Sequence, residues 1–189
     1  HLVGIGTFQP VANLFRIARQ MNPKLRRVGV VWNPTEHNSE ACVLKARAVC
    51  AELGIELAEA NAGNTSEVPE AIRSVLGRDV DAVWIGGDTV VNASTGSIVS
   101  IAKAAGVPVF TNDPTDTARG ALVCLGASYP DVGRTIGALS AKLLRGTDPR
   151  TIGVENVVPE RLTINGDVLA AFAPAWSASP EFLARAAAK

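Results

Sequence analysis

Two carboxylates, Glu36 and Asp88, have the side-chain types and positions best suited to chemistry in this sequence. Each follows an apolar run and lies in a short polar loop that opens a predicted helix. A carboxylate in such a loop can pair with a ligand ammonium group or accept hydrogen bonds from sugar hydroxyls. It can also cap the helix, which is the ordinary structural role of Asp at a helix start. The sequence leaves both roles open.

Further polar side chains lie in the same kind of loop. Asn38 and Ser39 stand where a helix begins, so they can cap it or lie beside free N–H groups that bind a carboxylate. Asn112 and Asp113 precede a proline, where a turn is as well supported as a ligand contact, and Asn92 is a weaker candidate. The predicted ligand-binding set is Asn33, Glu36, Asn38, Ser39, Asp88, Thr89, Asn92, Asn112 and Asp113.

No catalytic constellation accompanies these residues. Ser39, His37 and Asp88 could be drawn as a triad, but the serine and the histidine are two residues apart and no G-x-S-x-G turn is present. The stretch Gly86-Gly87-Asp88 is not a dinucleotide-binding fingerprint, and a G-x-x-x-x-G-K-[ST] phosphate loop is also missing. We therefore predict no catalytic residue, no metal and no cofactor, and we expect that the protein is not an enzyme.

Composition argues against several kinds of partner. The 18 Lys and Arg residues balance the 18 Asp and Glu residues of the 189-residue chain. Without a basic cluster, such a chain has no nucleic-acid footprint and no attraction to an anionic membrane. No apolar run approaches the roughly 18 residues of a membrane span. Cys42, Cys50 and Cys124 have apolar neighbours and no metal-ligand spacing, so we expect buried thiols.

A regular alternation of strands and helices positions the polar loops. Apolar runs typical of strands covered on both faces span 28–32, 55–60, 80–85, 107–110 and 121–125. Predicted helices span about 39–53, 68–76 and 90–105. Crossovers of this length require parallel pairing, which predicts a doubly wound, Rossmann-like α/β sheet with strand order 2-1-3-4-5. Residues 33–39 and 86–92 would then face each other across the crevice where such sheets bind ligands.

Beyond residue 126 the alternation ends. The spacing predicts a helix over 131–144, whose apolar face includes Val132, Ile136, Leu139 and Leu143. Extended chain follows over 150–165.

A series of motifs, in this order, resembles a known family. The motifs are Asn33-Pro34-x-Glu36-x-Asn38-Ser39, Asp81-Ala82-Val83 with Asp88, Val107-Pro108-Val109-Phe110, Gly120-Ala121, Gly126-x-x-Tyr129-x-x-x-Gly133, Leu143-x-x-Gly146-x-x-Pro149 and Ile164-Asn165. Together they cover nearly the whole chain and resemble the extracytoplasmic solute-binding proteins of ABC transporters, in the family that includes the tryptophan- and tyrosine-type importers.

This resemblance implies a type I periplasmic binding protein, in which two α/β lobes close around a ligand without catalysis. On that pattern, residues 7–124 and 162–189 form the second lobe, and residues 125–161 are a return segment of the first. The rest of the first lobe would precede residue 1, so the resemblance implies a fragment. It also implies a periplasmic or extracytoplasmic location, with a small ligand and a membrane permease as partners.

Two functions are compatible with these observations. One is the solute-binding component of an ABC import system, with an amino acid as the expected ligand and a sugar still open. The alternative is an effector-sensing domain of a transcription regulator, because such domains share this architecture. The helix at 130–145 would lack the sheet that it was built to cover, so we also expect a homodimer through its apolar face.

Overall fold

The central sheet has the predicted strand order. In the computed structural model, which describes residues 3–156 and 159–187, the strands lie in the order β3-β2-β4-β5-β6-β8. Their bounds are β2 (Arg27–Trp32), β3 (Glu56–Asn61), β4 (Ala82–Ile85), β5 (Val109–Thr111), β6 (Val123–Ala127) and β8 (Glu160–Ile164). The first five are parallel, which confirms the doubly wound fold, and β8 adds an antiparallel edge strand beside β6.

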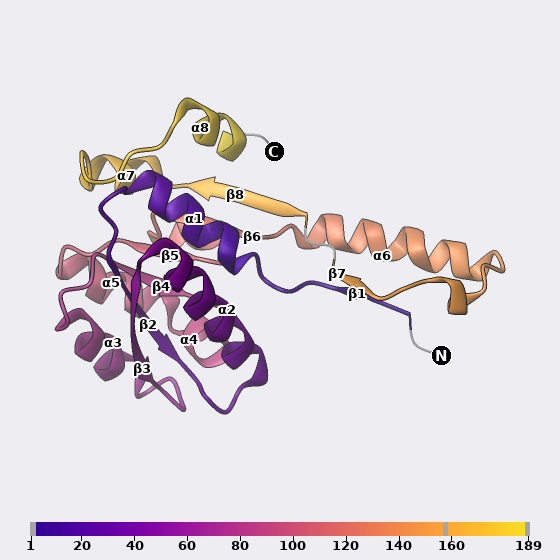
Figure 1. Cartoon of the computed structure of the whole chain (residues 1–189), viewed down its shortest axis with the longest axis horizontal. Coiled ribbons are helices and arrows are strands. Elements are labelled where there is room, and N and C mark those ends of the chain that lie inside the picture. The colour runs from indigo at the N-terminus through magenta and orange to yellow at the C-terminus, as the bar shows by residue number, and fades with distance from the viewer. Residues whose placement is uncertain (1–2, 157–158, 188–189) are drawn as a thin grey trace.

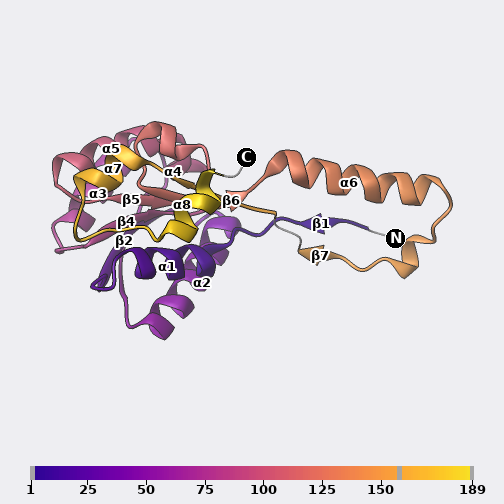
Figure 2. The same ribbon diagram turned by 90° about the horizontal axis from the view of Figure 1, so that it is seen from above.

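Helices cover both faces of this sheet. The helices of the described residues are α1 (Val11–Met21), α2 (His37–Leu53), α3 (Val68–Leu76), α4 (Thr89–Ala93), α5 (Thr95–Ala104), α6 (Tyr129–Leu144), α7 (Gly166–Ala171) and α8 (Pro180–Ala187), with 3-10 turns at Asp116–Arg119 and Pro149–Thr151; of these, α6 and the second turn lie outside the body (Figure 1). Figure 2 shows α1 and α2 on one side of the sheet and α3 and α5 on the other. Each side has its own buried apolar cluster, as expected for strands covered on both faces.

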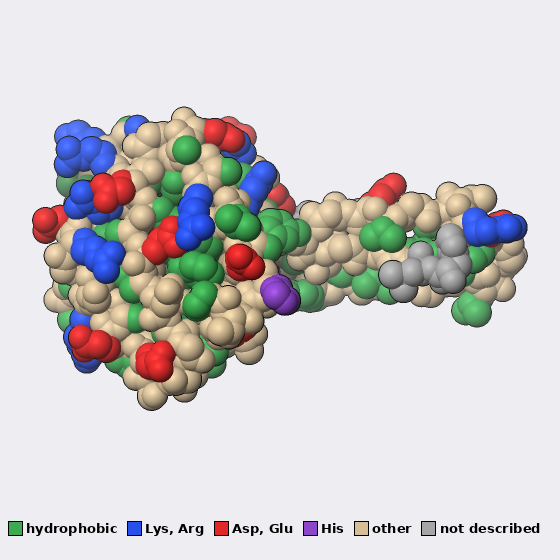
Figure 3. Space-filling model, turned by 60° about the horizontal axis from the view of Figure 1, so that its bottom comes forward, with side chains coloured by type: hydrophobic (Ala, Val, Ile, Leu, Met, Phe, Trp, Pro, Cys, Tyr) green, Lys and Arg blue, Asp and Glu red, His purple; other side chains and the backbone are tan. Residues whose placement is uncertain are grey.

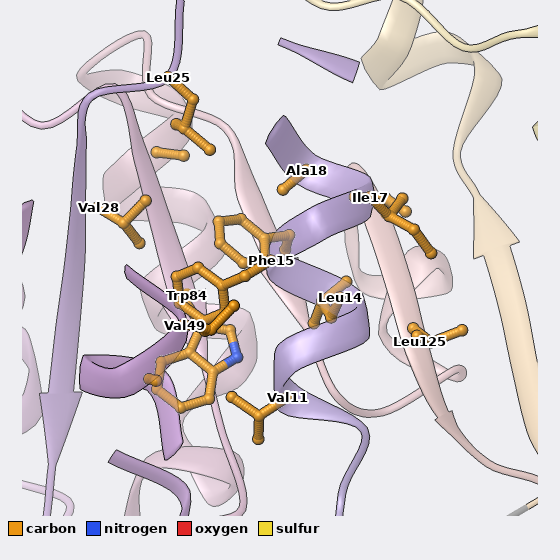
Figure 4. Close-up of a cluster of buried hydrophobic side chains, with 14 of the residues drawn as sticks. Val11, Leu14, Phe15, Ile17, Ala18, Leu25, Val28, Val49, Trp84 and Leu125 are labelled. Atoms are coloured by element: carbon orange, nitrogen blue, oxygen red, sulfur yellow. The ribbon is translucent and has the colours of Figure 1, made fainter. Parts of the chain in front are cut away.

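Aromatic packing joins α1 to the middle of the sheet. Phe15, fully buried on α1, meets the rings of Trp84 on β4 and Phe110 on β5 edge to face, with centroids 5.2 Å away in both cases. Figure 4 shows Phe15 between the helix and Trp84, with Leu14 and Ala18 beside it. Such pairs stabilise a core by about 0.5–1.5 kcal/mol beyond the area that they bury. This contact fixes β4, whose carboxyl end carries the loop at residues 86–88.

One predicted helix is interrupted. The segment 90–105 forms the two helices α4 and α5, which are separated at Ser94. The hydroxyl of Thr95 donates to the carbonyl of Asn92 at 3.0 Å, and such side-chain hydrogen bonds compete with helical ones. The break leaves α4 as a short helix at the end of β4.

An arm extends from the body of the molecule. It contains α6 and a two-stranded parallel ribbon of β1 (Ile5–Gly6) and β7 (Glu155–Asn156). Figures 1 and 2 show α6 alongside this ribbon and away from the central sheet. The chain passes between body and arm three times: after β1, after β6 and before β8.

Hydrogen bonds join these crossings where the arm meets the body. The N–H of Phe8 donates to the side-chain oxygen of Asn156 at 2.7 Å, which links the first and third crossings. Asn13 donates to the Glu160 carboxylate at 2.6 Å, and so ties α1 to the start of β8. Among the described residues, no helix combines the length and apolar character that crossing a membrane requires.

Candidate ligand-binding site

The candidate site lies at the carboxyl edge of the sheet. Because β2, β4, β5 and β6 are parallel, the loops after all four strands gather at this edge. The arm starts from the same edge, since β6 ends at Ala127 and α6 begins at Tyr129. The predicted apposition of residues 33–39 and 86–92 is confirmed by direct hydrogen bonds between the two loops.

Asp88 holds these loops together from inside the protein. It is 3% exposed, and one of its carboxylate oxygens accepts from the Asn33 N–H and from the Ser39 hydroxyl, both at 2.6 Å. The other oxygen accepts from the Val91 N–H at 2.7 Å and caps α4. The Asp88 carboxylate is therefore buried and engaged by three donors, and its direct contact with a ligand stays a prediction. Of the two roles that the sequence left open, the structure shows the cap.

Glu36 reaches across the crevice from the opposite loop. Its carboxylate is half-buried and accepts from the N–H groups of Thr89 and Val90, at 2.9 and 3.3 Å. Burial alone would raise the pKa of Glu36, but these hydrogen bonds, with another from the Asn33 side chain, hold the pKa below its ordinary value. Glu36 is therefore ionised at neutral pH and remains partly accessible to a ligand.

Three more predicted residues lie inside the protein, below the surface of the edge. Asn33, Ser39 and Asn112 are each buried. Asn33 accepts from both the N–H and the hydroxyl of Thr35, which stabilises a turn after β2. Asn112 accepts from the Trp84 indole at 2.9 Å and donates to a backbone carbonyl of β6, so it links three strands below the edge. These three side chains are therefore buried below the edge, and their contact with a ligand stays a prediction.

The remaining predicted residues are accessible. Asn38 and Thr89 are exposed, and Asn92 and Asp113 are half-buried. The Asn38 amide donates to the Gly87 carbonyl at 2.8 Å, which orients it over the crevice. One oxygen of Asp113 accepts from the N–H and hydroxyl of Thr115, so the turn role that the sequence allowed is present. The predicted set therefore divides into two groups. The buried residues, which support the loops from below, are Asn33, Ser39, Asp88 and Asn112. The accessible residues, which form the surface of the edge, are Glu36, Asn38, Thr89, Asn92 and Asp113.

The two helices that start at this edge differ in their first turns. The N–H groups at the start of α4 are taken by Glu36 and Asp88. Within residues 3–156 and 159–187, no side-chain hydrogen bond caps α2, a helix of 17 residues, although its first residues His37 and Asn38 are exposed. Free N–H groups and the positive end of a helix dipole favour an anion. The start of α2 can therefore receive a carboxylate.

Glycine is required in the loop after β4, at residues 86 and 87, which lies next to the start of α2. A side chain at Gly86 would lie 2.7 Å from the Trp84 ring, and one at Gly87 would lie 3.1 Å from the Cys42 sulfur. The loop therefore runs closely over the core, which leaves the crevice above it open. Burial raises the pKa of Cys42, so this thiol stays protonated at neutral pH.

Gln9 was not predicted as a site residue. It lies on the first crossing from the arm, and its side chain is 3.5 Å from the position that a Cβ on Gly87 would take. Its side-chain oxygen is buried without a hydrogen-bond partner. Nothing local in the sequence marks Gln9, because the contact joins residues 78 positions apart in the chain.

The fold defines a class, an α/β lobe of the type I periplasmic-binding-protein kind, in which the loops after the parallel strands gather at one edge of the sheet. The family model described as "ABC transporter substrate binding protein" matches residues 2–173, and the chain belongs to this family. Members of the family are extracytoplasmic proteins that bind small ligands and work with a membrane permease. Among the described residues, no group of three or more His, Cys, Asp and Glu side chains is placed to hold a metal ion.

Similar proteins support the assignment of the chain to this family. A tyrosine-binding protein of Clostridioides difficile is 25% identical over 168 residues, which are 89% of this chain and 48% of that protein. A conserved domain protein of Vibrio cholerae has a TM-score of 0.84 at 25% identity, over 98% of this chain and 62% of that one. A domain from Streptococcus pneumoniae in complex with L-Trp has a TM-score of 0.83 at 18% identity, over 98% and 63%. The chain thus spans about half the length of its curated relative.

Proposed function

We propose that the protein binds an amino acid at the carboxyl edge of its sheet, as the solute-binding component of an ABC import system. The observation that carries this proposal is that the α2 start, which has no side-chain cap among the described residues, lies beside the ionised carboxylate of its N-cap residue, Glu36. The helix start is complementary to a carboxylate, and the Glu36 carboxylate is complementary to an ammonium group. An amino acid presents both groups on one carbon atom. Two similar proteins are named for ligands of this class, one as a tyrosine-binding protein and one as a complex with L-Trp.

A regulator function receives less support. A LacI family transcriptional regulator of Bifidobacterium animalis has a TM-score of 0.62 at 17% identity, a likeness that concerns the fold alone. The family match favours transport. An extracytoplasmic location and a permease partner go with the proposed function.

We also propose that body and arm belong to different lobes of a two-lobed clamp. Residues 7–124 and 162–189 would form one lobe, with 125–161 contributing to the other. The start of β8 at Glu160, which pairs with the central sheet, supports a return to the body near this boundary. Closure over a ligand would then be a hinge motion at the three crossings. The ligand would be held between the edge described above and the other lobe.

The arm supports a further part of the proposal, association through α6. Val132 alone is buried among the described residues of α6, whereas Ile136 is 43% exposed and Leu144 is 89% exposed. Figure 3 shows charged side chains mainly on the body and few on the arm. Apolar surface of this kind marks an association site, and for this chain by itself we propose a homodimer.

Multi-angle light scattering over a concentration series tests this homodimer. We expect a mass near twice the 19.7 kDa of the chain. Leu144→Glu should shift the mass toward the monomer, whereas Ala138→Glu, the same charge at an exposed position two residues from Ile136 and so on another side of α6, should not. A wild-type mass of 19.7 kDa at every concentration would contradict it.

Titration calorimetry with a panel of amino acids and small sugars tests the ligand proposal. We expect saturable binding of an amino acid, weakened about tenfold in Glu36→Gln, since one charge-assisted contact contributes roughly 1.4 kcal/mol or more. Glu40→Gln is the matched control, because Glu40 is exposed one turn later on α2 and its side chain makes no hydrogen bond or ion pair among the described residues. Binding of sugars alone, or equal affinity in both variants, would reject the assigned role of Glu36.

A further inference from the structure

A second concave surface lies at the opposite end of the sheet. This groove has a volume of about 880 Å³ and runs between the end of α1, the turn before β2, the start of β4 and the segment after α7. Arg27 and Ala82 begin β2 and β4, so the groove is at the amino end of these strands. It is separate from the ligand edge and does not depend on the proposed function.

Cationic and amide side chains line the groove. They are Arg19, Asn22, Lys24 and Arg26, together with the single acid Asp81. The Asp81 carboxylate is engaged, because one oxygen accepts from the N–H groups of Arg26 and Arg27, at 2.7 and 2.9 Å. The side chains of Lys24 and Arg26 are exposed and form no ion pair within the described residues. The groove therefore presents three cationic side chains, Arg19, Lys24 and Arg26, against the one carboxylate of Asp81.

The turn that carries these cations is fixed by the body. The Leu25 side chain is fully buried, and its N–H donates to the Asn22 carbonyl at 3.0 Å. The Asn22 side chain accepts from the Lys24 N–H at 3.0 Å, which leaves its amide N–H groups for the groove. The opposite wall is tied down as well, because the Ser177 N–H donates to the Met21 carbonyl at 2.9 Å. The donors are therefore held on a preformed backbone.

A group with several oxygen acceptors and more than one negative charge fits these donors. A guanidinium binds such a group through two parallel hydrogen bonds, and a lysine ammonium adds a point charge. The concave shape favours a discrete group that enters the groove over an extended flat polyanion. A single carboxylate would leave most of the donors unmatched.

We propose that this groove binds the phosphate group of a phosphate-bearing molecule through Lys24, Arg26 and the Asn22 amide. Arg19 shares in the binding, although one of its N–H groups already donates to the Leu25 carbonyl. The phosphate can come from a soluble molecule or from a lipid headgroup. The same donors serve both sources, and the experiment separates them.

Titration calorimetry with sodium pyrophosphate at low and high salt is the test. We expect saturable binding that weakens as salt rises, because the groove is open to solvent. The double variant Lys24→Glu/Arg26→Glu should lose this binding, and Arg26→Ala alone should weaken it about tenfold, the equivalent of 1.4 kcal/mol. Both side chains are exposed and the Asp81 contacts are made by backbone N–H groups, so the melting temperature should not change.

A second double variant controls for net charge. Lys142→Glu/Arg145→Glu removes two exposed cations of the arm that form no ion pair among the described residues, and it should keep wild-type affinity for pyrophosphate. Co-sedimentation with vesicles that contain phosphatidic acid, lost only in Lys24→Glu/Arg26→Glu, would assign the phosphate to a lipid. No saturable binding in either assay, or equal loss in both double variants, would overturn the proposal.

Discussion

Replacing Asp88 by alanine should destabilise the protein far more than an ordinary surface change. The variant removes the α4 cap, a loss of about 0.5–2 kcal/mol. It also leaves the Asn33 N–H and the Ser39 hydroxyl buried without their acceptor, at a cost of about 1–3 kcal/mol for each unsatisfied group. Because Ser39 can turn to another acceptor, we expect a total near 3–5 kcal/mol.

Urea denaturation followed by circular dichroism measures this loss. Asp113→Ala is the matched control, because Asp113 also accepts a backbone N–H and a hydroxyl after a strand but is only half-buried. We expect about 1 kcal/mol from this control, the typical loss of one cap. If Asp88→Ala lost no more than Asp113→Ala, Asp88 would not be the buried junction of the two loops.

Three further predictions concern pH, thiols and backbone contacts. The pKa of Glu36 is lower in the folded state than its ordinary value of 4.5. The ionised side chain therefore stabilises the folded protein fully above pH 4.5, and this contribution is lost as the pH falls through the folded-state pKa. Glu36→Gln should reduce the loss of stability on acidification. Burial raises the pKa of Cys50 and Cys124 to about 12, so neither thiol should react with a thiol reagent at pH 8 until urea unfolds the chain. Gly126→Ala would place a Cβ 2.1 Å from a backbone oxygen and should lower the melting temperature, whereas Gly133→Ala on α6 meets nothing within 4 Å and should raise it slightly.

The strand order could be predicted because it depends on local patterns. Apolar runs and helix signals alternate from residue 28 to residue 125, and short crossovers leave few topologies. The same reasoning placed residues 33–39 opposite residues 86–92. The break at Ser94 was missed, because an apolar period does not reveal a hydroxyl that bonds to a carbonyl.

The separation of supporting residues from surface residues was beyond the sequence. Glu36 and Asp88 are both acids that follow a strand, yet one is half-buried and the other is 3% exposed. The difference is set by Asn33 and Ser39, which lie 55 and 49 residues from Asp88 in the chain. No local signal carries such a contact. For the same reason, nothing local in the sequence indicates that Asp81 and the segment after α7 lie around the cations before β2.

The central claim is that the carboxyl edge of this chain binds an amino acid. A titration of the ¹⁵N-labelled chain with L-tyrosine, followed by amide chemical shifts, tests it directly and detects weak binding as well as strong. We predict saturable shifts at the start of α2, at residues 37–39, and in the loop at residues 86–89, with none in the turn at residues 22–26. Shifts confined to other parts of the chain, or none at millimolar amino acid, would contradict this claim.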